Sequence, residues 1–218
     1  MNSVVVAKFG GSVIGVDGIS IPVIIQRINS LSKDAKVVAV FSAPLTVVEG
    51  KRRSLTDVAL ELGKRAEDGK AFDLIILRKT YEKILELVSS EFQEKCRTVI
   101  DGCLDMVRIE LEKAMEKKEF ADEVRSKTLA YSGEILMSNV MEYILQSQGI
   151  KSKVVGLDNW PIITDSNIES TNFLASESNK KVEFLERLLD ENQVITIGGF
   201  IGRTVDGVIT TYERGGSD

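Results

Sequence analysis

The first forty residues carry two short apolar runs, separated by a stretch with helical spacing. Residues 4–7 are a valine-rich run, which is typical of a buried strand. A glycine pair ends this run, and Ser20 then precedes apolar residues that recur every three or four positions. Residues 36–41 form the second apolar run. This order predicts a β-α-β unit with two parallel strands.

The middle of the chain has a different pattern, because apolar residues from 54 to about 148 recur at helical spacing. One stripe covers residues 77–92 and a second covers 96–114. A third helical stretch covers 123–148, and a glycine within it could interrupt the helix. Residues 74–77 could form a short strand. The block is too long for a simple crossover, so it predicts a helical subdomain.

The strand pattern resumes after residue 149. The predicted elements are strands over 152–157, 162–164 and 193–197, a helix over 179–189, and a hairpin over 203–211 that is centred on an Asp-Gly pair. No linker divides the chain. The whole pattern predicts a three-layer α/β/α sandwich around a mainly parallel sheet, with a helical insert over about 54–148.

Composition narrows the chemistry. Apolar residues make up 43% of the 218 residues, charged residues 28%, and the net charge is −5, so a nucleic-acid surface is not expected. No apolar run approaches about 20 residues and no secretory signal is recognisable, so we expect a cytoplasmic protein without a membrane span. There is no histidine and there are two cysteines, which excludes imidazole-dependent triads and a protein-ligated zinc site. Carboxylates, lysine, arginine, backbone amides and Mg²⁺ remain.

A glycine-containing turn directly follows the first predicted strand. Backbone amides at Gly10, Gly11 and Ser12 could hold anionic oxygens, and Lys8 at the strand end would add a positive charge. A tight turn with an exposed lysine explains the same residues equally well. The segment is neither a dinucleotide fingerprint nor a Walker loop.

Two further clusters lie near the end of the chain. Residues 198–204 follow a predicted parallel strand, at the sheet edge where open α/β sheets bind ligands, although a flexible connection into the hairpin is the alternative. Residues 212–218 combine an arginine, two glycines, a serine and an aspartate. This set could clamp a carboxylate, and its composition also fits a flexible tail.

Six motifs, in order over the whole chain, resemble those of aspartokinases in the amino-acid kinase superfamily. They are KFGGS at 8–12, FSAP at 41–44, LTD at 55–57, SGE at 132–134, GGFIG at 198–202 and TTYERGGSD at 210–218. The RGGSD ending separates aspartokinases from the acetylglutamate, carbamate and uridylate branches. The resemblance implies transfer of the γ-phosphoryl of ATP, with Mg²⁺, to the side-chain carboxylate of L-aspartate. The product is 4-phospho-L-aspartate, the first step towards lysine, threonine and methionine, and a homodimer is implied.

The resemblance also assigns the phosphate side of the site. It implies that Lys8 steadies the transferring phosphoryl group and that Gly10, Gly11 and Ser12 hold phosphate oxygens. Asp218 is implied to organise the catalytic end by orienting Lys8. These roles suit phosphoryl transfer, which requires positioning and charge neutralisation and little covalent help.

On the aspartate side, the resemblance implies that Glu134 contacts the amine and Arg214 the α-carboxylate. The remaining pocket residues that it implies are Ser42, Phe200 and Ser217. The substrate threonine is either Thr46 or Thr56, and we favour Thr56 because the LTD motif leads into a helix.

Two departures from the family pattern carry expectations of their own. Residues 45–53 are an insertion that contains three successive cations. We interpret the cations at 51–53 as a solvated loop, with a lid that touches phosphate as the alternative. The nucleoside-binding segment of the family lies beyond RGGSD, so we expect residues 1–218 to be a C-terminally incomplete catalytic domain that does not turn over. The alternatives are another enzyme of the same fold, or a catalytically incompetent aspartate-binding or assembly fragment.

Overall fold

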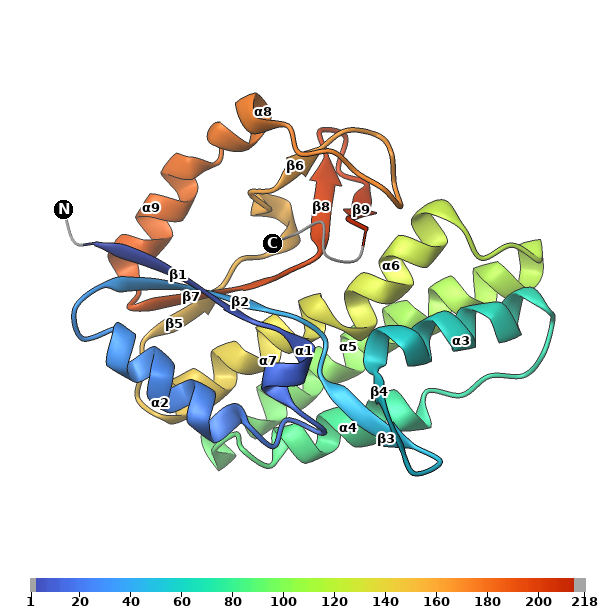
Figure 1. The fold of residues 1–218 in the computed structure, drawn as a ribbon, viewed down its shortest axis with the longest axis horizontal. Coiled ribbons are helices and arrows are strands. Elements are labelled where there is room, and N and C mark those ends of the chain that lie inside the picture. Colours follow the sequence, from blue (N-terminus) through green and yellow to red (C-terminus); the bar gives the residue numbers. More distant parts are fainter. Residues whose placement is uncertain (1–2, 214–218) are drawn as a thin grey trace.

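A four-stranded parallel sheet forms the centre of the molecule (Figure 1), and the computed structural model describes residues 3–213. In spatial order the strands are β1 (Val4–Phe9), β2 (Lys36–Phe41), β7 (Val194–Gly198) and β5 (Ser152–Val154). The register pairs Phe9 with Phe41 and Phe41 with Gly198. The carboxyl ends of three strands therefore meet at one edge of the sheet, where α/β folds bind their ligands.

Helices cover the sheet and extend beyond it. The main helices are α2 (Ile21–Leu31), α3 (Leu55–Glu67), α4 (Ile75–Leu85), α5 (Ser90–Lys117), α6 (Asp122–Ser132), α7 (Glu134–Ser147) and α9 (Val182–Glu191). Three shorter ones are α1 (Gly11–Ile14), α8 (Ala175–Asn179) and a 3₁₀ turn (Leu157–Asn159). α7 packs along β7 and β2, and it joins the sheet to α5 and α6. Within the described residues, no helix has the length and apolar character that a membrane span requires.

The expected α/β class with a mainly parallel sheet and a helical block is confirmed. The interruption of the third helical stretch is also confirmed, because α6 ends at Ser132 and α7 begins at Glu134. The strand considered for residues 74–77 was wrong. Ile75 begins α4, and Leu77 belongs to the buried stripe of that helix, so helical periodicity overrides a short apolar run.

The interpretation of residues 51–53 as a solvated loop was also wrong. They belong to an antiparallel hairpin of β3 (Leu45–Val48) and β4 (Lys51–Ser54). Its turn residues Glu49 and Gly50 both have positive φ, at 49° and 77°, which matches the twist of the flanking strands. In Figure 1 the hairpin projects from the sheet beside α3 and α4.

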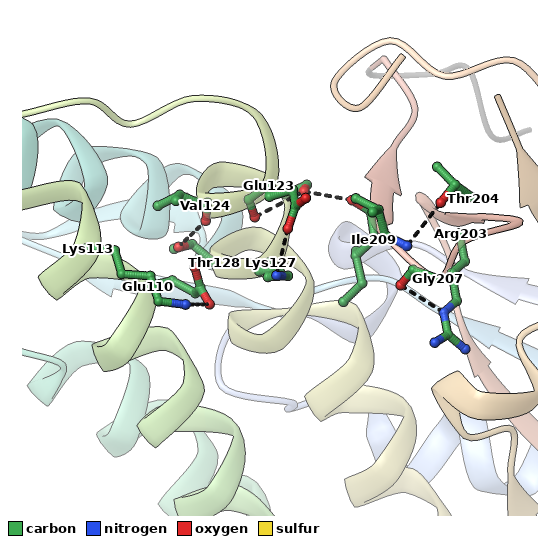
Figure 2. A network of polar contacts seen from close by, with 12 residues as sticks. Glu110, Lys113, Glu123, Val124, Lys127, Thr128, Arg203, Thr204, Gly207 and Ile209 are labelled. Carbon is green, nitrogen blue, oxygen red and sulfur yellow. Dashed lines mark hydrogen bonds and ion pairs between the residues drawn. The ribbon is translucent and has the colours of Figure 1, made fainter. Parts of the chain in front are cut away.

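A second small sheet is formed by β6 (Ile163–Thr164), β8 (Ile201–Thr204) and β9 (Ile209–Thr211). The hairpin predicted around Asp206-Gly207 is present as β8 and β9. Figure 2 shows this hairpin beside α6. The hydroxyl of Ser126, a residue of α6, donates to the Ile209 carbonyl at 2.8 Å. Within the hairpin, Arg203 Nε donates to the Gly207 carbonyl at 3.0 Å. α6 therefore connects the helical block to the end of the chain that the structure describes.

Packing of the helical block can be tested with two helical glycines. A Cβ built on Gly63 in α3 would lie 2.1 Å from Cε1 of the buried Phe120 ring, whereas one on Gly102 in α5 meets nothing within 4 Å. We expect Gly63→Ala to lower the free energy of unfolding by about 1–3 kcal/mol through overpacking. Gly102→Ala should raise it by about 0.5–1 kcal/mol, since alanine restricts the unfolded chain. Urea denaturation of both variants measures their free energies of unfolding. Equal values for the two variants would contradict the close contact of Gly63 with Phe120.

Candidate functional site

The ends of β1, β2 and β7 open into a cleft with a volume of about 430 Å³. Most of the expected site residues meet in this one cleft: Lys8, Gly11, Ser12, Ser42, Thr56, Glu134 and Phe200. Six other lining residues were not among the assigned site residues, although a phosphate-contacting lid at 51–53 was the alternative interpretation: Ala43, Leu45, Arg52, Arg53, Ser54 and Asp57. Segments that are more than 180 residues apart along the chain thus contribute to a single site. The placement agrees with the expectation, and the role of each residue stays a prediction.

The other expected residues are placed differently. Gly10 precedes α1 and is not among the lining residues. Arg214, Ser217 and Asp218 lie outside the described residues. Of the two candidate threonines, Thr46 is 5% exposed and its hydroxyl donates to Asp17 Oδ1 at 3.0 Å and accepts from Thr80 at 2.9 Å. Thr46 therefore holds β3 in place, and the geometry favours Thr56 as the cleft residue.

The glycine turn after β1 is required by a close backbone approach. A Cβ on Gly11 would lie 2.5 Å from the carbonyl oxygen of Ala43, so a larger residue would push the turn away from the end of β2. Gly10 has an extended backbone (φ −69°), and its carbonyl accepts from Val13 and Ile14 at 2.9 and 3.0 Å. The turn thus brings Ser12 next to the segment that follows β2.

Glu134 is the first residue of α7 and the most unusual group in the cleft. Its side chain is 4% exposed, and Oε1 accepts from the Ala43 backbone amide at 3.2 Å. Oε2 is buried without a hydrogen-bond partner among the described residues. Burial raises the pKa of Glu134 to about 7, against the lowering effect of the Ala43 hydrogen bond. A buried carboxylate with one free oxygen is a site that a ligand cation can complete.

Glu134 is held by two glycines and a tyrosine. A Cβ on Gly198 would lie 2.9 Å from Glu134 Cβ, and a Cβ on Gly133 would lie 2.9 Å from Ala43 Cβ. The hydroxyl of the buried Tyr81 lies 3.1 Å from the carbonyls of both Ser132 and Gly133, at the break between α6 and α7. Burial, followed by the charge of Glu134, raises the pKa of Tyr81. Tyr81 lies within an apolar helical stripe of the sequence, which predicts that its hydroxyl is buried and needs a hydrogen-bond partner, but not which one.

Phe200 lies in the turn between β7 and β8 and has a left-handed backbone, with φ at 65°. This conformation costs a bulky residue about 1–3 kcal/mol, and it is found mainly where the surroundings over-determine it. Here Gly199 N donates to the Phe41 carbonyl at 2.8 Å, and Tyr212 N donates to the Phe200 carbonyl at 3.0 Å. The two hydrogen bonds fix the turn that brings Phe200 to the cleft.

The remaining wall combines β4 and the start of α3. Ser54 caps α3, because its hydroxyl accepts from the Asp57 amide at 3.0 Å, as the capping-box pattern predicts. The Arg53 guanidinium donates to Glu61 Oε2 at 2.5 Å and to the Asp57 carbonyl at 3.3 Å. Among residues 3–213, no group of three or more Cys, Asp or Glu side chains converges as a metal site.

The model of the amino acid kinase family matches residues 3–218, so the chain belongs to the amino acid kinase family. Among individual relatives, the aspartokinase of Rickettsia felis is 34% identical over 87 residues, which are 40% of this chain and 21% of that protein. The resemblance to aspartokinases expected from the motifs is confirmed.

Solved aspartokinases share the fold over nearly the whole chain. Escherichia coli aspartokinase III in complex with aspartate and ADP matches 99% of this chain with a TM-score of 0.76 and 19% identity. The same enzyme with lysine and aspartate matches 100% with a TM-score of 0.72 and 20% identity. Clostridium acetobutylicum aspartate kinase matches 98% with a TM-score of 0.64 and 20% identity. The chain spans 42–45% of the length of these proteins.

The raised pKa of Glu134 predicts a pH-dependent stability. Below the ordinary pKa of 4.5 both folded and unfolded states are protonated, and as the pH rises towards 7 the unfolded state loses its proton first. Stability therefore falls over this window, by about 3 kcal/mol for a pKa raised from 4.5 to about 7. Glu134→Gln removes the cost of ionising this buried carboxyl. The Tm of the variant minus the Tm of the wild type should therefore increase from pH 5 to pH 8, by about 2–4 °C for each kcal/mol of stability.

Scanning calorimetry at several pH values measures this difference. Glu110→Gln is a matched control, because Glu110 is also buried, at 2% exposure, but pairs with Lys113 at 2.7 Å. A Tm difference for Glu134→Gln that does not change with pH would show that the carboxyl titrates normally.

Proposed function

We propose that the protein is an aspartate kinase, which transfers the γ-phosphoryl of ATP to the side-chain carboxylate of L-aspartate to give 4-phospho-L-aspartate. The observation that carries this proposal is the buried Oε2 of Glu134, which has no hydrogen-bond partner among residues 3–213, in a cleft shared with Lys8 and Ser12. Membership of the amino acid kinase family supports phosphoryl transfer, and E. coli aspartokinase III, which shares the fold, was solved with aspartate and ADP.

On this proposal the amino acid binds at the floor of the cleft. Its ammonium group donates to Glu134, which replaces the missing hydrogen bond and pairs a buried charge. Thr56, Ser42 and Phe200 line the same cleft and bound the rest of the substrate. The side-chain carboxylate then points towards Lys8, where the phosphoryl group arrives.

Lys8 stabilises the charge on the transferring phosphoryl group. It extends from β1, where the backbone is paired with Val40 of β2, so a rigid sheet holds its position. Mg²⁺ enters with ATP in this proposal. The described cleft offers two carboxylates, Asp57 and the buried Glu134, so the ion would be held mainly by phosphate oxygens and water, as is usual for Mg²⁺ in kinases.

The organisation of the chain is part of the same proposal. Residues 1–218 form an amino-acid kinase catalytic domain, with the helical subdomain over about 54–148, acting in the cytoplasm as a homodimer. The apolar stripes of the helical block are packed against one another, and the large apolar residues exposed in that block are Ile75 and Ile109. The homodimer therefore rests on the resemblance to aspartokinases and stays a prediction that sedimentation can test.

Binding of L-aspartate tests the proposed substrate directly. Isothermal titration calorimetry should show that the wild type binds L-aspartate and discriminates against succinate, which has the same two carboxylates and no amine. Glu134→Gln should weaken L-aspartate binding by about 30-fold or more, as expected for removing one partner of a buried ion pair, and should abolish the discrimination. Glu110→Gln should change neither the affinity for L-aspartate nor the discrimination against succinate. Tighter binding of L-glutamate than of L-aspartate would favour a different acceptor.

Catalysis tests the role of Lys8. The assay uses a longer chain that includes the nucleoside-binding segment of the family, with MgATP, L-aspartate and hydroxylamine to trap the acyl phosphate. In that chain Lys8→Met should lower kcat by at least about 100-fold, since preorganised charge at a transition state contributes about 10²–10³ in rate. Lys8→Arg should not restore it fully, because a planar guanidinium is larger than an ammonium. Lys51→Met is the control. A Lys8→Met enzyme with a normal circular dichroism spectrum and a kcat within a few-fold of the wild type would refute the role.

A further inference from the structure

The β3–β4 hairpin lines the cleft mainly with one of its two faces, and Arg53 lines it from the other face. Successive side chains of a strand point to opposite faces, and the register pairs Leu45 with Ser54 and Val47 with Arg52. These four residues therefore share one face of the hairpin. Three of them, Leu45, Arg52 and Ser54, line the cleft beside Lys8. The inserted hairpin is thus a wall of the site and carries an arginine into it.

The root of this hairpin is tied to the segment that follows α1. Leu45 N donates to the Gly15 carbonyl at 3.2 Å, and Asp17 N donates back to the Leu45 carbonyl at 2.8 Å. Asp17 also accepts from Thr46 at 3.0 Å and pairs with Lys83 of α4 at 2.5 Å. Because β3 is fixed on both sides, the backbone of the hairpin has a defined position relative to Lys8.

The two arginines of β4 differ in how they are held. Arg53 is fixed to α3 through Glu61 and the Asp57 carbonyl, so its charge is partly compensated. Arg52 is exposed and makes none of the hydrogen bonds or ion pairs found among residues 3–213. A guanidinium at the mouth of a cleft, with five donors and no acidic partner, is suited to a ligand with several oxyanions.

We propose that Arg52 binds the phosphate oxygens of the nucleotide, so that the β3–β4 hairpin supplies a second cation opposite Lys8. This inference rests on the proposed function. Glu134, which would take the amine, is 4% exposed at the floor of the cleft, whereas Arg52 is exposed at its mouth. The amino acid therefore occupies the inner part and the phosphates the outer part. A phosphate chain offers an arginine the paired oxygens that bidentate binding needs.

Calorimetric titration of the 218-residue protein with inorganic tripolyphosphate and, separately, with L-aspartate tests the proposal. Arg52→Gln should weaken tripolyphosphate binding about tenfold, as expected for a hydrogen bond to a charged group, and leave L-aspartate binding unchanged. The matched control is Lys51→Gln, which removes the same charge from the neighbouring position but does not line the cleft, and it should change binding less than about twofold. Arg52→Lys should weaken tripolyphosphate binding by less than Arg52→Gln does. Arg52→Gln should also make tripolyphosphate binding less dependent on salt concentration.

Each other outcome overturns the proposal in a distinct way. Equal effects of Arg52→Gln and Lys51→Gln would show that Arg52 acts through net charge alone. A loss of L-aspartate binding in Arg52→Gln would assign the guanidinium to the amino acid. If the wild type binds L-aspartate but not tripolyphosphate, the phosphate assignment fails while the amino-acid site stands. If it binds neither, the proposed function itself fails.

Discussion

The close packing of α7 against the ends of β2 and β7 determines the site. Gly133 and Gly198 lack the side chains that would separate these elements, and the Ala43 amide satisfies one oxygen of Glu134 while the other is left without a partner among the described residues. A buried carboxylate in this state destabilises the folded protein when ionised. A ligand cation that pairs with the Glu134 carboxylate would remove this cost, and the buried ion pair would then be a strong and selective contact.

The rest of the cleft arranges charge around that carboxylate. The sheet supplies a rigid floor, on which Lys8 is held by the strand ladder between β1 and β2. The hairpin supplies a cationic wall that is anchored at its root to the segment after α1. A single pocket thus holds an anionic group at its inner end and cations towards its mouth. That polarity suits a substrate with an ammonium at one end and a phosphate donor that approaches from the other.

Local signals allowed much of this to be predicted. A strand that leads into glycines predicted the sheet edge, and the motifs identified Glu134, Ser42 and Phe200 as residues of one cleft. The β3–β4 hairpin was missed because its two strands are short, because β4 is polar, and because its Glu-Gly turn is not the usual Asn-Gly or Asp-Gly pair. Which of the two cleft arginines is paired depends on how β4 packs against α3, and the contact of Tyr81 with the α6–α7 break depends on packing between distant segments. Neither is encoded in local spacing.

The central claim is that Glu134 is an incomplete ion pair awaiting an ammonium group. Carbon-detected NMR of protein labelled at the glutamate carboxyl groups, with Glu134→Gln to assign the signal, measures this directly. Without ligand, the account predicts that Glu134 titrates near pH 7, and saturating L-aspartate should move its pKa below that value because the bound ammonium favours the carboxylate. An ordinary pKa in the free protein, or a pKa that L-aspartate does not change, would contradict the account.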